Sequence, residues 1–120
     1  MINKWLIVLG IVLIDQISKF LVNNVVKNTG LAFGLFTGYN FLHIFLILII
    51  TSILIYFLIN SNDYAVYGFS FLVGGSLGNL IDRIMLGYVR DFITISVWPS
   101  FNVADIFNVI GVIILIKYWK

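Results

Sequence analysis

The sequence predicts an all-α membrane protein with four transmembrane helices, and its composition and length are the main reasons. Of the 120 residues, 62% are hydrophobic and only 10% are charged. Ordinary soluble domains are about 45–50% apolar, so this chain lacks the polar side chains needed to cover a globule in water. At a rise of about 1.5 Å per residue, a wholly helical chain of this length would cross a ~30 Å hydrocarbon core about six times, and turns and polar stretches reduce that to about four.

Four apolar runs give the positions of the predicted spans. Within one integral-membrane domain of residues 1–120, we expect helices over about residues 5–22, 41–59, 64–86 and 103–118. The polar turn from Asn60 to Asp63 leaves room only for an antiparallel return between the second and third runs. Asp15 and Lys19 interrupt the first run, and no cleavage site of small residues follows it, so we expect this run to be retained as a helix.

The composition also excludes several chemistries. The chain has no Cys and a single His, His43, which removes thiol nucleophiles, cysteine zinc sites and His-rich metal sites. Its net charge of +2 is too small for a nucleic-acid surface, so we expect no nucleic-acid partner. The acidic residues are five Asp and no Glu. We predict neither a cofactor nor a metal, and we expect any catalysis to rest on Asp, Lys, Arg, Ser, Thr, Tyr or the single His.

The third run ends in a cluster of polar side chains. Gly74 and Gly78 have the spacing that lets helix backbones approach closely. Asn79, Asp82 and Arg83 follow at i, i+3 and i+4, so they share one side of the helix end. An amide facing lipid would lack hydrogen-bond partners, which favours an inward-facing Asn79. We predict that Asp82 holds Arg83 or the loop backbone and is not a third catalytic acid.

Asp15 and Lys19 lie four residues apart on one face of the first predicted helix. Because an ionisable side chain at the centre of a membrane helix costs about 2.5–3.5 kcal/mol, each one needs a reason. One interpretation is a self-neutralising pair in which Lys19 extends to the far interface. The other is that the pair positions a polar ligand at the mouth of the bundle.

Asp91 and Asp105 are the most informative acids. They are fourteen positions apart, on either side of the connection between the last two spans, so a hairpin brings them to one membrane face. Asn102 is a good helix N-cap, and Asp105 stands at the third position after it, so Asp105 alone is explained by a capping box. The helix N-terminus also favours an ionised Asp105, whereas burial would favour a protonated Asp91. Two carboxyl groups in such different environments suit acid–base hydrolysis.

Five segments in order resemble a bacterial lipoprotein signal peptidase (signal peptidase II), a membrane aspartic peptidase. They are Asp15-Gln-Ile-Ser-Lys19, Asn28-Thr-Gly-Leu-Ala-Phe-Gly34, Gly78-Asn-Leu-Ile-Asp-Arg83, Gly87-Tyr-Val-Arg-Asp-Phe92 and Phe101-Asn-Val-Ala-Asp105. The resemblance implies that Asp91 and Asp105 form the catalytic dyad. It also implies that Asp15 and Lys19 lie beneath the site. The residues that it implies shape the site are Asn28, Gly30, Asn79, Arg83 and Asn102.

The resemblance also sets expectations for the cap, the substrate and the location. Only eight residues separate Lys19 from Asn28, so we expect a reduced extracytoplasmic cap between spans 1 and 2, and a short member of the family. The implied substrate is a diacylglyceryl-modified prolipoprotein, cut just before its lipidated cysteine. The implied location is the bacterial cytoplasmic membrane, with the active site near the extracytoplasmic face. With membrane lipid around it, we expect the protein to be a monomer.

The sequence also bears on the orientation in the membrane and on three rival functions. Lys residues at both ends of the chain favour cytoplasmic termini under the positive-inside rule. A small proton-coupled exporter would need an acid deep in a span facing a water-filled cavity, a demand that only Asp15 meets. A metal-dependent hydrolase using Asp91 and Asp105 is a second rival, although two Asp and an Asn are a poor ligand set for a transition metal. A non-enzymatic membrane assembly factor is a third.

Overall fold

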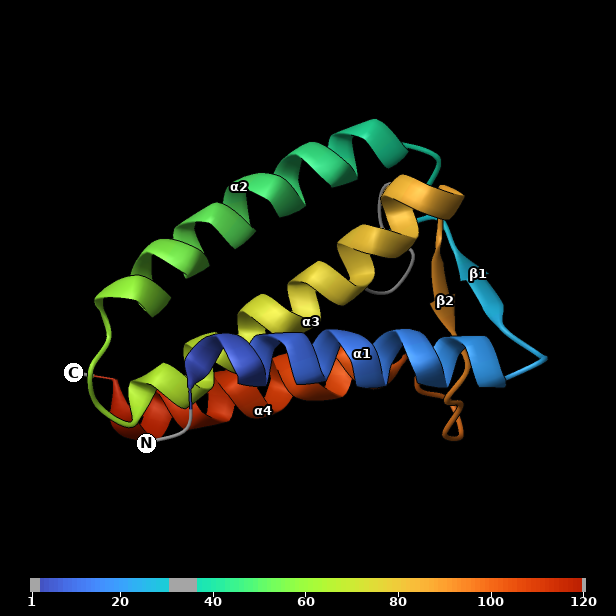
Figure 1. Ribbon diagram of the computed structural model, residues 1–120. Helices are drawn as coiled ribbons and strands as arrows, with labels where there is room; N and C mark the ends of the chain where they lie inside the picture. Colours follow the sequence, from blue (N-terminus) through green and yellow to red (C-terminus); the bar gives the residue numbers. More distant parts are fainter. Residues whose placement is uncertain (1–2, 31–36, 120) are drawn as a thin grey trace.

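Four helices and two short strands make up the described part of the chain, shown as a computed structural model in Figure 1. The structure describes residues 3–30 and 37–119. In chain order the elements are α1 (Lys4–Leu21), β1 (Val26–Asn28), α2 (Asn40–Asn60), α3 (Ala65–Leu86), β2 (Val89–Asp91) and α4 (Val103–Tyr118). All four predicted helices are confirmed, each with ends within one residue of the expected positions.

The helices differ in how well each suits a bilayer. Among the described residues, α2 and α3 are long and apolar enough to cross a membrane by length and composition. The first helix carries three charged side chains, Lys4, Asp15 and Lys19, and α4 has only 16 residues. Charged side chains in α1 and the short length of α4 therefore distinguish these two helices from α2 and α3.

Local sequence signals determine where the helices begin and end. The side chain of Asn3 accepts a hydrogen bond from the N–H of Trp5 and caps α1. At the end of α3, Gly87 adopts the left-handed conformation (φ 84°), which glycine reaches without a Cβ penalty. Asn102 and Asp105 form the predicted capping box at the start of α4. Asp105 is thus held at the first turn of that helix.

The third helix lies at the centre of the bundle and packs against the other three. Its glycines allow the close approach: a Cβ on Gly74 would lie 2.8 Å from Ile11 of α1, and one on Gly75 would lie 2.7 Å from the carbonyl oxygen of Ala104 in α4. The predicted role of the Gly74–Gly78 spacing in close helix packing is confirmed. The helices that carry the polar site therefore meet at α3.

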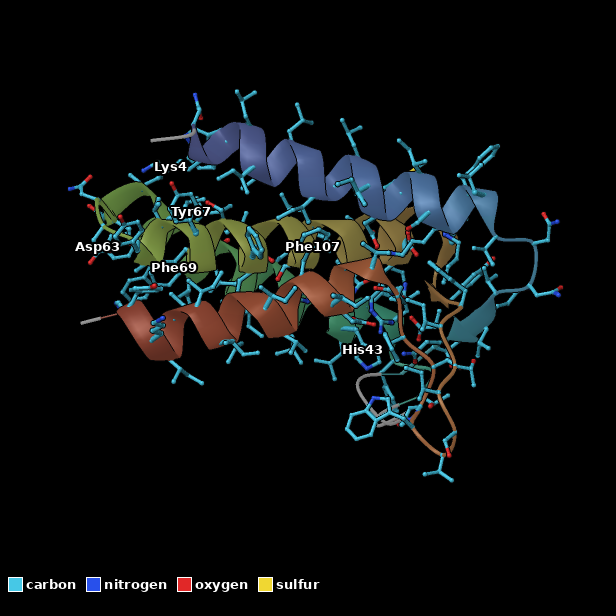
Figure 2. The ribbon with its side chains drawn as sticks, turned by 90° about the horizontal axis from the view of Figure 1, so that it is seen from below. Lys4, His43, Asp63, Tyr67, Phe69 and Phe107 are labelled. Carbon is cyan, nitrogen blue, oxygen red and sulfur yellow. The ribbon has the colours of Figure 1, made fainter. Side chains whose placement is uncertain are left out.

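The apolar core lies toward the end of the bundle where both termini are found (Figure 1). Figure 2 shows Tyr67 and Phe69 at this end, near Lys4 and Asp63. The ammonium group of Lys4 donates to the carbonyl oxygens of Leu58 and Ile59, at 2.8 and 3.2 Å, and so closes the last turn of α2. The buried members of the core come from α1, α2 and α3, namely Val8, Leu58, Ala65, Val66, Phe69 and Val73.

A two-stranded sheet at the opposite end departs from the all-α expectation. Strands β1 and β2 are antiparallel, with Val26 opposite Asp91, Lys27 opposite Arg90 and Asn28 opposite Val89. Beyond them, an isolated bridge joins Ile93 to Phe101. Strands of three residues are too short for a pattern of alternating polarity, so the sequence showed only polar connections here. This sheet places Asn28 and Asp91 next to the start of α4.

Candidate active site

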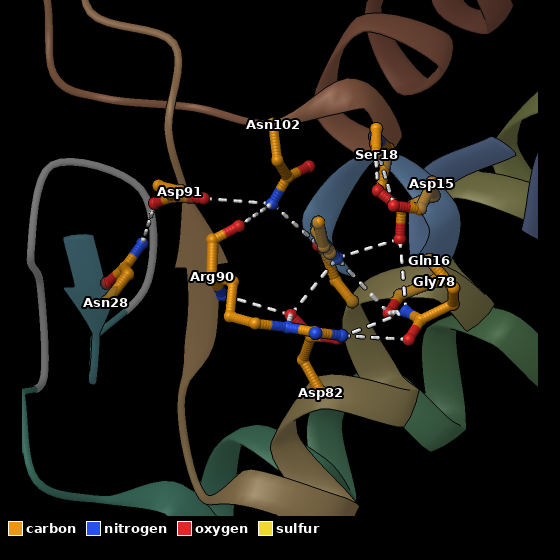
Figure 3. Close-up of polar contacts among 12 residues, drawn as sticks. Asp15, Gln16, Ser18, Asn28, Gly78, Asp82, Arg90, Asp91 and Asn102 are labelled. Atoms are coloured by element: carbon orange, nitrogen blue, oxygen red, sulfur yellow. Dashed lines mark hydrogen bonds and ion pairs between the residues drawn. The ribbon is translucent and has the colours of Figure 1, made fainter. Parts of the chain in front are cut away.

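Asn102 joins the two predicted catalytic acids. Its side-chain amide donates to Asp91 Oδ1 at 2.9 Å, and its backbone N–H donates to Asp105 Oδ2 at 3.0 Å. Asn28 of β1 donates to the other oxygen of Asp91 at 3.2 Å (Figure 3). Both carboxyl groups are thus held by neutral donors from neighbouring segments, with Asp91 only 3% exposed. The hairpin predicted to bring them together does so.

Asn79 connects this pair of acids to the interior of the bundle. Its oxygen accepts hydrogen bonds from Lys19 Nζ at 3.1 Å and from the amide of Asn102 at 2.9 Å. Its NH₂ group donates to Asp105 Oδ1 at 3.0 Å. Because a Lys ammonium can only donate, it determines which end of the Asn79 amide faces Asp105. The inward-facing position predicted for Asn79 is therefore confirmed.

An ion-pair network lies beneath the two acids. Lys19 Nζ is 2.7 Å from Asp15 and 3.2 Å from Asp82, and the side chains of all three are fully buried. The other oxygen of Asp15 accepts the backbone N–H of Ala104 at 2.9 Å, which ties α1 to the start of α4. The self-neutralising pair is confirmed, but Lys19 does not extend to the interface. A second acid and Asn79 surround its ammonium group inside the bundle.

Asp82 binds Arg90, and the predicted pairing with Arg83 is wrong. Asp82 accepts the Arg90 backbone N–H at 2.9 Å and its guanidinium at 2.8 and 3.2 Å. Contact with the loop backbone, the other half of that prediction, is confirmed. Gln16 joins the same group, donating to Asp82 at 3.1 Å and accepting from Arg90 at 2.9 Å. The hydrogen bond to Asp82 and the charge of Asp82 raise the pKa of Arg90 above its ordinary value.

Gln16 and Arg90 belong to this polar group, although neither was predicted from the sequence. Gln16 directly follows Asp15, and Arg90 directly precedes Asp91. An amide next to Asp15 in an apolar helix was one available signal, because it needs partners in lipid. Strand alternation was the other, since Arg90 must point away from Asp91 if the two are neighbours in a strand.

Arg83 lies on the cavity side of α3 and contacts a different segment from the one predicted. Its Nη2 donates to the carbonyl oxygen of Gly30, and the residue is only 3% exposed. Its Nε and Nη1 have no hydrogen-bond partner within the part of the chain that the structure describes. The predicted motif from Asn28 to Gly34 extends into residues 31–36, which lie outside the described residues. Gly30 itself is buried beside the site, as expected.

A cavity of about 630 Å³ opens onto both acids. The polar residues that line it include Asn28, Asn79, Arg83, Asp91 and Asp105. Its apolar wall is made by side chains from α2, β2, the following loop and α4, namely Ile47, Val89, Trp98, Phe101 and Val109. Such a combination of an apolar wall with a few convergent polar groups is typical of a ligand site.

The environment of Asp91 favours its protonated form. Burial, followed by the nearby negative charge of Asp105, raises the pKa of Asp91 from 3.8 to about 6. The hydrogen bonds from Asn28 and Asn102 act in the opposite direction and are weaker. A carboxyl group whose pKa is raised toward neutral pH takes up a proton more readily than an ordinary Asp, so it can act as an acid while a neighbouring carboxylate acts as a base.

Comparison with known proteins identifies the family. The family model described as signal peptidase (SPase) II matches residues 2–119. The chain belongs to the signal peptidase II family. It is therefore a membrane peptidase of lipoprotein maturation, as the five motifs indicated.

Relatives in this family match over most of their length. The lipoprotein signal peptidase of Halothermothrix orenii is 34% identical, with 97% of this chain and 94% of the relative covered. That of Caldicellulosiruptor bescii is 38% identical, with 92% and 86% covered. A solved structure, described as a bacterial membrane enzyme determined by the in meso method at 2.3 Å resolution, has a TM-score of 0.86 at 30% identity and covers 95% of this chain and 85% of that chain. This chain thus shares the fold of that membrane enzyme over most of its length.

Proposed function

We propose that the protein is an aspartic endopeptidase that removes signal peptides from diacylglyceryl-modified prolipoproteins, cutting just before the lipidated cysteine. The observation that carries the proposal is the pair of carboxyl groups, Asp91 and Asp105, bridged by Asn102 at one cavity. Membership of the signal peptidase II family supports the substrate class. The apolar wall of the cavity also suits a substrate that is itself apolar and lipid-anchored.

In the proposed mechanism the two acids take opposite roles. Asp105, ionised, accepts a proton from a water molecule that attacks the scissile carbonyl carbon. Asp91, protonated, donates toward the carbonyl oxygen. The capping position of Asp105 favours its charge, because the N-terminus of α4 carries a partial positive charge. Since the two groups titrate as a pair, the resting proton belongs to the dyad, with Asp91 as its preferred position.

Substrate binding and charge stabilisation are assigned to the polar wall. Arg83 has two N–H sides without partners in the described part of the chain, so it can donate to a substrate carbonyl oxygen. Asn28, Asn79 and Asn102 hold the two acids at a fixed separation. The acyl chains of the substrate remain in lipid while the scissile peptide reaches this wall. A donor already in place stabilises negative charge without reorganisation during the reaction.

The proposed topology has four membrane spans, cytoplasmic termini, and the site near the extracytoplasmic face. Both termini lie at the end opposite the sheet and the dyad (Figure 1), which is the arrangement that this topology requires. We further propose that the protein acts as a monomer in the bacterial cytoplasmic membrane. Reporter fusions after the last residue and in the Asn60–Asp63 turn are both expected to report cytoplasm. An external signal from the C-terminal fusion would contradict the orientation.

The test of the function is an assay with purified protein in detergent and a synthetic lipobox peptide carrying diacylglycerol on its cysteine. The expected result is release of the signal peptide with a new N-terminus at the lipidated cysteine. A matched peptide without the lipid measures how much the acyl chains contribute. If the lipidated peptide stays intact, or is cut at another bond, the proposed function is wrong.

The exporter alternative loses its only candidate residue. A proton carrier needs an acid that faces a water-filled cavity, and Asp15 was the acid assigned to that role. Its carboxylate instead bonds Lys19 and the backbone N–H of Ala104, and the residue is 0% exposed. The acids that do face a cavity are Asp91 and Asp105, at the end of the bundle.

A further inference from the structure

Arg90 directly precedes Asp91 in β2, and the two side chains serve different groups. Successive side chains in a strand point to opposite faces, so the residue before Asp91 points away from the dyad. Arg90 reaches Asp82 and Gln16, whereas Asp91 reaches Asn28 and Asn102 (Figure 3). The strand therefore connects the ion-pair network to the dyad through a single peptide bond.

The contacts of Arg90 fix its backbone as well as its side chain. Asp82 accepts from the Arg90 backbone N–H at 2.9 Å, from Nη2 at 2.8 Å and from Nε at 3.2 Å. The carbonyl oxygen of Arg90 accepts from the Asn102 side chain at 3.3 Å. A two-pronged Arg–carboxylate pair is both stronger and more directional than a single bond. These contacts hold the peptide groups on both sides of the Arg90 Cα.

Gln16 holds Asp82, the acid that binds Arg90. Its amide donates to Asp82 Oδ1 at 3.1 Å and to the carbonyl oxygen of Gly78 at 3.0 Å, while its oxygen accepts from Arg90. Lys19 approaches Asp82 from the same helix at 3.2 Å. Asp82 is thus surrounded by donors from α1 and β2 and cannot rotate without losing several of them.

The sheet alone is too small to hold β2 in place. It has two strands with three paired residues each, and an isolated two-stranded ribbon is marginally stable in water. The contact of Arg90 with Asp82 instead anchors β2 to α3, the central helix of the bundle. The contact with Asp82 is therefore a further anchor for the strand that carries Asp91, beside its pairing with β1.

We propose that Arg90 is a positioning residue, which, with Gln16, fastens β2 to α3 and so holds the Asp91 carboxyl group against Asn102 and Asp105. The inference rests on the proposed function, because it assigns a role in the same reaction. Arg90 itself does not touch the substrate or the reacting atoms. It acts through the backbone of β2.

A displaced β2 would change the proton affinity of Asp91 as well as its position. The charged groups that face Asp91 are Asp105 of α4, Lys19 of α1 and Arg83 of α3. Burial and the charge of Asp105 together raise the pKa of Asp91 to about 6. If β2 moves outward, water reaches Asp91 and its distance from Asp105 increases. Both changes lower the pKa of Asp91 toward its ordinary value.

The chain offers a direct measurement, because its only carboxylic side chains are five Asp residues. Protein labelled with ¹³C at the Asp carboxyl carbons gives five side-chain signals, and the one lost in Asp91→Asn is that of Asp91. In Arg90→Ala, the titration midpoint of this signal is expected to fall by about one pH unit or more. Arg90→Lys keeps the charge and one donor, so an intermediate midpoint is expected. Lys27→Ala removes the cation at the β1 position opposite Arg90 and is expected to leave the midpoint unchanged.

Turnover of the lipidated peptide gives the second readout. Arg90→Ala is expected to lower kcat by about 100-fold, with little change in KM, because misplacing a reacting group by about 1 Å costs that much. Arg90→Lys is expected to recover part of the loss. If Arg90→Ala is folded and keeps the wild-type midpoint and kcat, or if Lys27→Ala shifts the midpoint equally, the inference is overturned. Should the wild-type protein cut no lipidated peptide, the proposed function fails, while the titration still decides whether Arg90 positions Asp91.

Discussion

Four buried or partly buried carboxyl groups lie at the sheet end of this protein, and they fall into two pairs with different partners. Asp15 and Asp82 bind cations, Lys19 for both and Arg90 for the second. The side-chain donors to Asp91 and Asp105 are all neutral amides, from Asn28, Asn79 and Asn102. The two pairs are separated by little more than the Asn79 side chain, which contacts both Lys19 and Asp105.

The difference shows how one small bundle holds acids for two purposes. A cation fixes both the geometry and the charge of a carboxylate, which suits an acid that must never take up a proton. An amide fixes the geometry while leaving the proton free to come and go, which suits an acid that must exchange one with substrate. The cation-bound acids therefore support the fold, and the amide-bound acids are available for chemistry.

The largest effect is expected from the amide-bound pair. Asp91→Asn and Asp105→Asn are each expected to lower turnover of the lipidated peptide by about 10²–10⁴-fold or more, because a required proton donor or acceptor is lost. Asn is nearly isosteric with Asp, so both variants are expected to insert and fold. Either variant with near wild-type turnover would remove that residue from the mechanism.

Substitutions in the cation-bound pair are expected to lower stability more than they lower turnover. Asp82→Ala leaves Arg90 and Lys19 without a shared partner in a buried site, which is expected to cost about 3–5 kcal/mol of unfolding free energy. Asp82→Asn keeps one acceptor oxygen and is expected to retain part of the stability and some turnover. Thermal unfolding in detergent and peptide turnover measure the two effects. An Asp82→Asn variant as inactive as Asp91→Asn, at unchanged stability, would place Asp82 in the chemistry.

Asp91→Asn is expected to make the protein more stable at neutral pH. The folded-state pKa of Asp91, about 6, lies above its ordinary value of 3.8. The stability that its protonation contributes is therefore fully present below the ordinary value and is lost as pH rises through 6. Removing the buried charge should then raise the free energy of unfolding by up to about 3 kcal/mol above pH 7, and leave it unchanged at low pH. Unfolding curves at about pH 4 and pH 8 test this, and a variant that is less stable than wild type at the higher pH would contradict it.

A smaller effect is expected where α3 and α4 meet beneath the dyad. Gly75→Ala places a Cβ against Asn108 and 2.7 Å from the carbonyl oxygen of Ala104, so the two helices must separate. Overpacking of this kind costs about 1–3 kcal/mol. Gly10→Ala is the matched control, because a Cβ there meets nothing within 4 Å. Thermal unfolding of both variants is the measurement, and equal destabilisation would mean that close packing is not the cause.

Chelation of divalent metal is expected to have no effect on turnover. Two Asp and neighbouring amides form a poor ligand set for a transition metal, and the proposed mechanism uses protons alone. Peptide turnover before and after treatment with a chelator tests this. Activity lost on chelation and restored by Zn²⁺ or Mg²⁺ would favour the metal-dependent hydrolase.

Some contacts at the site were predictable because they lie within a few residues of one another. The capping box of Asn102 and Asp105 and the pair of Asp15 and Lys19 are set by helical spacing, which reads directly from the chain. The partner of Asp82 was not predictable in this way. Arg83 is the neighbour of Asp82 in the chain, but adjacent helix residues do not face each other. Arg90 of β2 binds Asp82 instead.

The sequence by itself determined the four helices and their ends, and it indicated the two acids of the proposed dyad. The helices follow from long apolar runs and local caps, and the two acids from their places on either side of one short connection. Only the tertiary structure decided the sheet, the contact between Arg83 and Gly30, and the contacts of Gln16 and Arg90. Those contacts join residues up to 74 positions apart, and their formation depends on how closely the helices approach at the glycines of α3. Helix spacing and side-chain direction after packing are properties of the folded chain, and no short stretch of sequence contains them.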